Sequence, residues 1–247
     1  MIEWQDEGIL LGSKLLGESK SILSILTRFH GRIGGVLRLT RALRVQGGIQ
    51  AGNTIKLSFK ARLEEHLGSL SLEVTNSLTS HVVTHHPKLL ALTTAMCLIQ
   101  EMTAERHPYP LLYEEVSSFL NQLKEKNWMP HYLRLEEKIL QEMGFGLKLK
   151  ECCVTGTTED LIYVSPKTGR AVSRMAGDPY KEKLLRLPSF LLSPGREMED
   201  LPPPSEMCHG FRLMDSFLKR HMGRAAYEKV SQGRDALLAI IEKHDQI

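Results

Sequence analysis

Basic residues gather in one stretch of the chain that contains no acidic residue. Residues 19–62 include no Asp or Glu but nine Lys or Arg. Clustered cations attract a phosphate backbone, and the planar fork of arginine matches two phosphate oxygens. The pattern therefore predicts nucleic-acid binding. We expect the contacts to come from Arg28, Arg32, Arg38, Arg41, Arg44, Lys56, Lys60 and Arg62.

Two other interpretations of this basic stretch stay open, namely a solvated surface and an interface for an acidic protein. Aromatic residues bear on the kind of binding, because proteins that bind single strands without sequence preference stack bases on aromatic rings. The only Phe, Trp or Tyr residues among the first 80 are Trp4, Phe29 and Phe59. Phe29 and Phe59 fall on apolar faces and are predicted to be core residues. We therefore expect binding that is mostly electrostatic, salt-sensitive and indifferent to sequence.

Three histidines offer a second kind of chemistry. His81, His85 and His86 stand close together in the segment S-H-V-V-T-H-H-P, and His81 and His85 have the spacing of two metal ligands on one helix face. This spacing raises the alternative of a metal-dependent hydrolase. However, no Glu lies between the two, and Pro87 indicates that a helix only begins here. A polar linker is the favoured interpretation.

Other catalytic signatures are missing from the sequence. There is no phosphate-binding loop, no nucleotide-binding fingerprint and no G-x-S-x-G. The neighbouring carboxylates Glu136 and Glu137 are expected on a helix surface. We therefore expect a protein that binds rather than one that catalyses.

The basic stretch falls within a segment that is predicted to be all strand. Short apolar or alternating runs are bounded by glycines, and residues 54–62 alternate most clearly, with Ile55, Leu57 and Phe59 on one face. Five such runs in about 75 residues are typical of a small barrel, and small barrels often bind oligonucleotides. The runs are residues 8–16, 21–29, 32–39, 54–62 and 70–74.

Beyond residue 80 the pattern becomes helical. Apolar residues at spacings of three and four predict a helix that begins near Pro87 and ends before Pro108. The other expected helices cover residues 111–126, 130–143, 206–222 and 225–244. Between the third and fourth helices, residues 161–172 resemble a short hairpin, and residues 187–204 form a proline-rich loop.

Composition agrees with a globular intracellular protein. The 247 residues are 42% hydrophobic and 25% charged, and the net charge is +3. The longest nearly apolar run, Leu89 to Ile99, is too short to cross a membrane. The N-terminus is acidic where a signal peptide would be basic, and four cysteines do not make a disulfide framework. We expect a cytoplasmic, nucleoid-associated protein with no membrane partner.

The chain resembles the bacterial RecO family of recombination mediators over nearly its whole length. The resemblance begins with W-Q-D-E-G-I-L-L-G at residues 4–12 and continues through T-R-F-H-G-R at 27–32 and A-R-L-E-E-H-L-G at 61–68. Its most specific stretch is C-V-T-G-T-T-E-D-L-I-Y-V-S-P-K-T-G-R-A-V-S at residues 153–173. None of these motifs is a catalytic signature, but their order and coverage make the resemblance specific.

The resemblance implies an α+β architecture with four parts. An N-terminal five-stranded OB-fold barrel that binds DNA would cover residues 1–79, and an all-helical domain would follow. Residues 80–149 would be the first part of that domain, and 150–186 a small zinc-ribbon-like hairpin insertion. The proline-rich loop and the closing helices would occupy residues 187–247.

The resemblance also implies a function. The family binds single- and double-stranded DNA and anneals complementary strands without ATP. Its members work with RecR and the C-terminal tail of single-strand-binding protein, and possibly with RecF and RecA, so that RecA loads on coated single strands in gap repair. The alternative function is that of an RNA- or ribosome-associated barrel protein.

In one respect the sequence departs from the family pattern. Many members carry four zinc-binding cysteines in the insertion, whereas the matching positions here are Cys152, Thr155, Ser173 and Ala176. Four ligands are needed for a structural zinc site. We therefore expect no bound zinc and no other cofactor.

Overall fold

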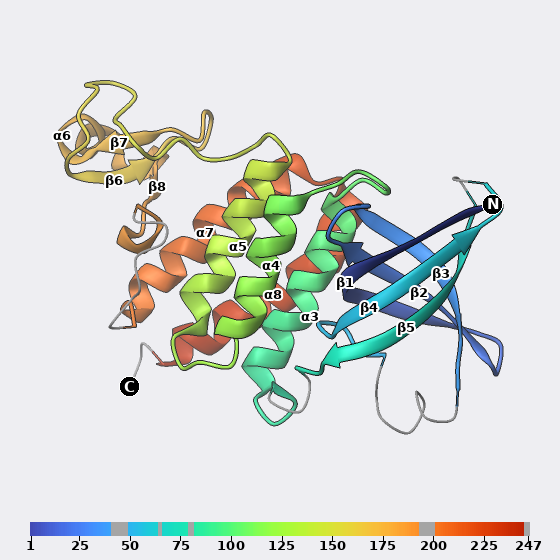
Figure 1. Cartoon of the computed structure of the whole chain (residues 1–247). Coiled ribbons are helices and arrows are strands. Elements are labelled where there is room, and N and C mark those ends of the chain that lie inside the picture. Colours follow the sequence, from blue (N-terminus) through green and yellow to red (C-terminus); the bar gives the residue numbers. More distant parts are fainter. Residues whose placement is uncertain (41–48, 64–65, 79–81, 193–200, 245–247) are drawn as a thin grey trace. The chain divides into compact units, whose positions relative to one another are not determined.

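The computed structural model describes the chain except for residues 41–48, 64–65, 79–81, 193–200 and 245–247 (Figure 1). The chain divides into two compact units, Met1–Lys124 and Glu125–Ile247. The first unit contains the expected strands and two helices. The second contains three long helices and the small insertion.

The first unit is built around a closed five-stranded barrel (Figure 1). Its strand order is β1-β2-β3-β5-β4, with β3 and β5 parallel and the other neighbours antiparallel. This partly Greek-key arrangement is that of an OB-fold, so the expected fold is confirmed. The strands are β1 (Ile2–Leu16), β2 (Lys20–Thr27), β3 (Arg32–Arg38), β4 (Thr54–Ala61) and β5 (Gly68–Asn76).

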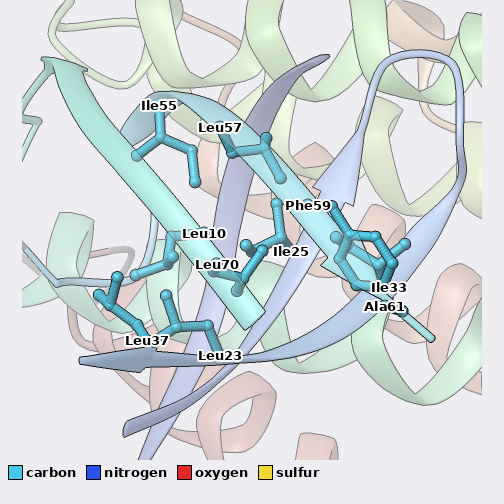
Figure 2. Packing of buried hydrophobic residues seen from close by; sticks show 10 residues of the cluster. All are labelled: Leu10, Leu23, Ile25, Ile33, Leu37, Ile55, Leu57, Phe59, Ala61 and Leu70. Carbon is cyan, nitrogen blue, oxygen red and sulfur yellow. The ribbon is translucent and has the colours of Figure 1, made fainter. Parts of the chain in front are cut away.

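Alternating apolar residues fill the interior of the barrel. In β4, Ile55, Leu57 and Phe59 are buried while Lys56 and Lys60 are exposed, as the sequence predicts. Figure 2 shows ten buried side chains from all five strands directed toward one another inside the barrel. Each buried Leu, Ile or Phe contributes about 1.5–3 kcal/mol. The pairing register is thereby fixed, because a slip of one residue would turn the apolar set outward.

Two helices complete the first unit. Helix α3 (His86–Met102) begins with Pro87 in its first turn, and its Leu92 lies against Gly52 of the barrel. A Cβ atom at Gly52 would come within 2.7 Å of Leu92, so this close approach requires glycine. Helix α4 (Pro110–Gln122) follows with a buried face that includes Val116 and Phe119. Both helices were expected, although α4 ends four residues earlier than predicted.

The second unit is held together by three helices and one buried ion pair. Helices α5 (Trp128–Glu142), α7 (Pro204–His221) and α8 (Arg224–His244) match the predicted helices closely. Arg234 Nε of α8 lies 2.7 Å from Glu136 Oε1 of α5, and both side chains are almost fully buried. The prediction that Glu136 lies on a helix surface is therefore wrong. Its partner is 98 residues away, so the local sequence carries no sign of the pairing.

The insertion contains a three-stranded sheet. Strands β6 (Leu161–Val164) and β7 (Ala171–Ser173) form the predicted hairpin, and β8 (Leu185–Arg186) adds a third strand beside β6. Between β7 and β8 lie α6 (Arg174–Gly177) and a 3-10 helix (Asp178–Lys183), and a second 3-10 helix, Ser189–Leu191, opens the proline-rich segment. The Tyr163 hydroxyl donates to Asp178 Oδ1 at 2.8 Å, and Arg186 lies over the tyrosine ring.

Candidate nucleic-acid interface

Three basic side chains share the outer face of β1, β2 and β3. The pairing sets Lys20 opposite Arg38 and also opposite Leu16, while Lys14 lies opposite Ile22 one step along the same face. Lys14, Lys20 and Arg38 are exposed and form no ion pair with any residue that the structure describes. We call these three residues the basic strand face. No such pair neutralises these three charges, so they are open to a polyanion.

The β4–β5 connection borders this same face. Arg62 directly follows β4 and is exposed. Leu67, farther along the connection, lies over β3, where a Cβ atom at Gly34 would meet it at 3.3 Å. OB-folds bind oligonucleotides on the face of their second and third strands, between the β1–β2 and β4–β5 loops. Of the eight predicted contacts, Arg38 and Arg62 therefore lie where that fold binds its ligand.

Arg28 and Arg32 lie at the opposite end of β2 and β3, and both are engaged. Arg28 Nη2 is 2.7 Å from a carboxylate oxygen of Glu114, and Arg32 Nη1 is 3.1 Å from one of Glu105. Arg32 Nε also donates to the Thr103 carbonyl oxygen at 3.1 Å. These arginines join the barrel to α4 and to the segment after α3. Part of their charge is neutralised by carboxylates from outside the basic stretch.

Tyr113 lies beside Arg28 and stays neutral. The pKa of Tyr113 is raised to about 12, mainly by burial and next by the nearby Glu7 carboxylate. The Arg28 guanidinium lowers this pKa, but by less than Glu7 raises it. The hydroxyl is therefore protonated throughout the physiological range. It adds no negative charge to this end of the barrel.

Lys56 and Lys60 occupy a different face, formed by β1, β4 and β5. Lys60 Nζ is 2.7 Å from Glu3, and Lys56 stands between Glu7 of β1 and Glu73 of β5 in the strand register. A broad groove of about 610 Å³ on this face is lined by both signs of charge. The basic stretch contains no acidic residue, but acidic residues from other parts of the chain therefore lie next to it in the folded barrel.

The structure thus separates the eight predicted residues instead of gathering them in one patch. Arg41 and Arg44 lie outside the described residues. Sequence reasoning left Lys14 and Lys20 out of the predicted contacts, although Lys20 belongs to the basic stretch. Only the strand register reveals that Lys14, Lys20 and Arg38 share a face, since Glu18 interrupts the basic residues along the chain.

The two phenylalanines of the barrel have opposite environments. Phe59 is buried in the core as predicted. Phe29 is 64% exposed, so its assignment to the core is wrong. The physical reason is that β2 ends at Thr27, which places Phe29 in the turn beyond the strand. One aromatic ring is therefore available on the barrel surface.

A polar cluster lies at three of the positions for which the resemblance implies zinc ligands. The Sγ atom of Cys152 accepts hydrogen bonds from Ser173 N at 3.2 Å and Ser173 Oγ at 3.4 Å. Burial alone would raise the pKa of the Cys152 thiol, but hydrogen bonds from Ser173 and Thr155 outweigh burial and lower that pKa to about 6. Three of the four positions therefore meet around one sulfur atom.

Metal binding has little support elsewhere. Within the described part of the chain, no group of three or more His, Cys, Asp or Glu is placed to hold a metal ion. His85 and His86 are both exposed at the start of α3, and His81 lies outside the described residues. The absence of zinc stays a prediction, which stoichiometric zinc in purified protein would overturn.

Comparison with known proteins decides the family. A family model described as Recombination protein O N terminal matches residues 1–78, and one described as Recombination protein O C terminal matches residues 86–229. The chain belongs to the RecO family. The chain is 40% identical over 247 residues to a protein named DNA repair protein RecO from Methylocella silvestris, with 99% of this chain and 98% of that protein covered.

Other RecO relatives agree over the same length. The RecO protein of Mesorhizobium japonicum is 38% identical, with 98% of this chain and 95% of that protein covered. The RecO protein of Rhodospirillum rubrum is 38% identical over 90% of this chain and 89% of its own length. RecO proteins belong to DNA repair and recombination, which agrees with an OB-fold that bears a basic strand face. No helix among the described residues is long and apolar enough to span a membrane.

Proposed function

We propose that this RecO-family protein is a non-enzymatic DNA-binding and strand-annealing recombination mediator. The proposal is supported chiefly by the basic strand face, which lies where OB-folds bind oligonucleotides, in a chain that matches RecO proteins over its whole length. In this role it acts on single- and double-stranded DNA at the nucleoid. It helps RecA to load on coated single strands during gap repair.

The mechanism needs no reacting group. Lys14, Lys20, Arg38 and Arg62 neutralise phosphates, which lowers the repulsion between two strands that approach each other. Base pairing between the strands supplies the sequence specificity, because phosphate contacts carry none. In the proposed role, the helical second unit contacts protein partners, which are RecR and the tail of single-strand-binding protein, with RecF as a further candidate.

The proposal predicts annealing that depends on the basic strand face. Two complementary oligonucleotides, one labelled at its end, are mixed without nucleotide over a salt series, both bare and coated with single-strand-binding protein. We expect the wild type to accelerate annealing in both conditions. Replacing Lys20 and Arg38 by Ala should lower the slope of log affinity against log salt by about 0.7 per residue for single strands.

Lys60→Ala is the matched control, since it removes a lysine that is paired with Glu3 on another face. Its salt slope should stay close to that of the wild type. If the protein anneals bare strands but not coated strands, the mediator role is contradicted, and the protein is a DNA-binding barrel without that role. If no annealing occurs at any salt and structured RNA binds better than DNA, the RNA-binding alternative replaces the proposal.

A further inference from the structure

A stack of aromatic rings lies at the end of the barrel where β1 begins. The Trp4 ring lies parallel to the His30 ring, with 3.8 Å between centroids and 2° between planes. Trp4 also stacks against Phe59, at 4.8 Å and 17°. Phe29, which is largely exposed, stands next to His30 in the β2–β3 turn. Four rings therefore gather at this end of the barrel, and Phe29 is the one that is largely exposed.

These rings line a pocket of about 240 Å³. Trp4, Phe29, His30 and Phe59 supply the aromatic part of the wall, and among the described residues that line it Arg106 is the one with a fixed charge. All the lining residues belong to the first unit. The pocket is thus a flat-walled apolar space with one cation beside it.

A buried carboxylate fixes the two rings of the turn. The Asp6 side chain is only 1% exposed. Its Oδ2 accepts hydrogen bonds from Phe29 N at 3.0 Å and from the His30 ring at Nδ1, 2.7 Å away. Its Oδ1 accepts one from Glu7 N at 2.8 Å. Asp6 is a positioning residue that holds the turn, and it is not among the residues that line the pocket.

The turn is also held from the side of the α3–α4 connection. Gly31 has a φ of +71°, and a Cβ atom there would lie 2.1 Å from the His107 carbonyl oxygen. Arg106 N donates to the Arg32 carbonyl oxygen at 2.8 Å. The pocket is therefore formed before any ligand arrives, which lowers the entropy cost of binding.

Cations stand close to the pocket. Arg106 uses one guanidinium nitrogen on the His66 carbonyl oxygen, at 3.0 Å, and has further N–H groups that can reach a phosphate. The Arg28 guanidinium lies 5.5 Å from the centre of the Phe29 ring, although Glu114 and Glu7 share its charge. Flat aromatic walls beside an arginine fit a base with its attached phosphate.

We propose that this pocket takes a single unstacked base of single-stranded DNA, with Phe29 as its outer wall and Arg106 close to the phosphate. The site rests on the proposed DNA-binding function and adds to it a contact to bases that the basic strand face lacks. An acidic peptide with an aromatic end is the competing occupant. The exposed ring of Phe29 favours the base, because its face is open and stacking uses the whole face of a planar ligand.

The test compares three ligands of equal length: an oligothymidine, an abasic strand and a duplex. The wild type should bind oligothymidine about 5- to 150-fold more tightly than the abasic strand, the range expected for stacking of one base. Phe29→Ala should lose this advantage and bind the abasic strand and the duplex as the wild type does. Phe29→Tyr keeps a ring and should restore the preference.

Phe145→Ala is the matched control, since it removes a partly exposed ring from the second unit. It should retain the full preference for oligothymidine. Equal binding of oligothymidine and the abasic strand by the wild type would overturn the pocket and leave the proposed function standing. Binding of neither strand would remove both. A change in Trp4 fluorescence on adding an acidic peptide, with no change on adding oligothymidine, would overturn the base as occupant.

Discussion

Cys152 is held by hydrogen bonds at a position that the resemblance to the family matches to a zinc ligand. In a zinc ribbon the thiolate is stabilised by the metal. Here Ser173 and Thr155, which the resemblance matches to two other ligand positions, donate hydrogen bonds to the sulfur. Hydrogen bonds to the charged form favour that form, which explains why the pKa falls in spite of burial.

This arrangement predicts a pH-dependent stability. The pKa of Cys152 is about 6 in the folded protein, against an ordinary value of 9.0, so the folded state favours the thiolate. The stabilisation is complete above pH 9 and is lost as the pH falls toward 6. Denaturant unfolding of the wild type and of Cys152→Ala should therefore give free energies whose difference grows between pH 6 and pH 9.

Cys153→Ala is the control for this measurement, because it removes the neighbouring thiol and leaves the cluster intact. Its difference from the wild type should not follow the same rise with pH. A difference between wild type and Cys152→Ala that is constant over this range would contradict the hydrogen-bonded thiolate.

At single residues, the sequence predicts well where a local pattern decides the environment. Phe59 alternates with two lysines in a strand, and it is buried as predicted. Phe29 also comes at the end of an apolar run and was predicted to be buried. However, strand β2 ends at Thr27, two residues before it, and the ends of elements are poorly marked in sequence. Glu136 is buried only because Arg234 reaches it from a distant helix.

Helices α5, α7 and α8 are linked through Arg234. Its guanidinium donates to both carboxylate oxygens of Glu136 on α5, to Asp215 on α7 at 2.8 Å and to the Phe211 carbonyl oxygen at 3.0 Å. These acceptors belong to three residues on two helices, Glu136 of α5 and Phe211 and Asp215 of α7. The arginine therefore fixes the register of the three helices as well as their separation.

Removing the arginine alone should destabilise the second unit strongly. Arg234→Met leaves the Glu136 carboxylate buried without its partner, which costs about 3–5 kcal/mol. The expected result is a loss of that size in the free energy of unfolding, measured by urea with the fluorescence of Trp128, which opens α5. The double change Arg234→Met and Glu136→Met should recover most of the loss, because an apolar pair can replace a buried ion pair.

Arg224→Met provides the comparison, since Arg224 pairs with Glu228 on the exposed surface of α8. Its effect should stay within about 1 kcal/mol. A loss for Arg234→Met no larger than this would show that the buried pair does not hold the helices.

Strands and helices with a regular spacing of apolar residues could be predicted from the sequence, but the way in which the strands pair could not. Four strands and five long helices fall close to the expected positions, because alternation and helical stripes are local properties. Strand β1 is the exception, since it begins at Ile2, six residues before the predicted run at residue 8. The parallel contact of β3 with β5 and the third strand β8 depend on distant parts of the chain. The basic strand face belongs to this second class, since it exists only in the register of β1, β2 and β3.

For the molecule as a whole, the position of charge matters more than its sum. The net charge of +3 is small for a protein of 247 residues. Glu3, Glu7, Glu105 and Glu114 come from outside the basic stretch and form ion pairs with three of its expected contacts, Arg28, Arg32 and Lys60. What remains uncompensated among the described residues of β1, β2 and β3 is the basic strand face.

This distribution predicts that two variants of equal net charge will differ in DNA affinity. Arg38→Glu and Lys243→Glu each lower the net charge by two, from +3 to +1, but Lys243 is an exposed residue of α8 in the other unit. Only Arg38→Glu should weaken binding of a single-stranded oligonucleotide, because phosphate contacts act within a Debye length of about 8 Å at physiological salt. The affinities are measured by fluorescence anisotropy between 50 mM and 300 mM salt.

The difference in DNA affinity between the two variants should narrow as the salt concentration rises, since screening weakens the contact that Arg38 makes. Equal weakening by both variants would mean that overall charge governs binding and that the basic strand face is not the site.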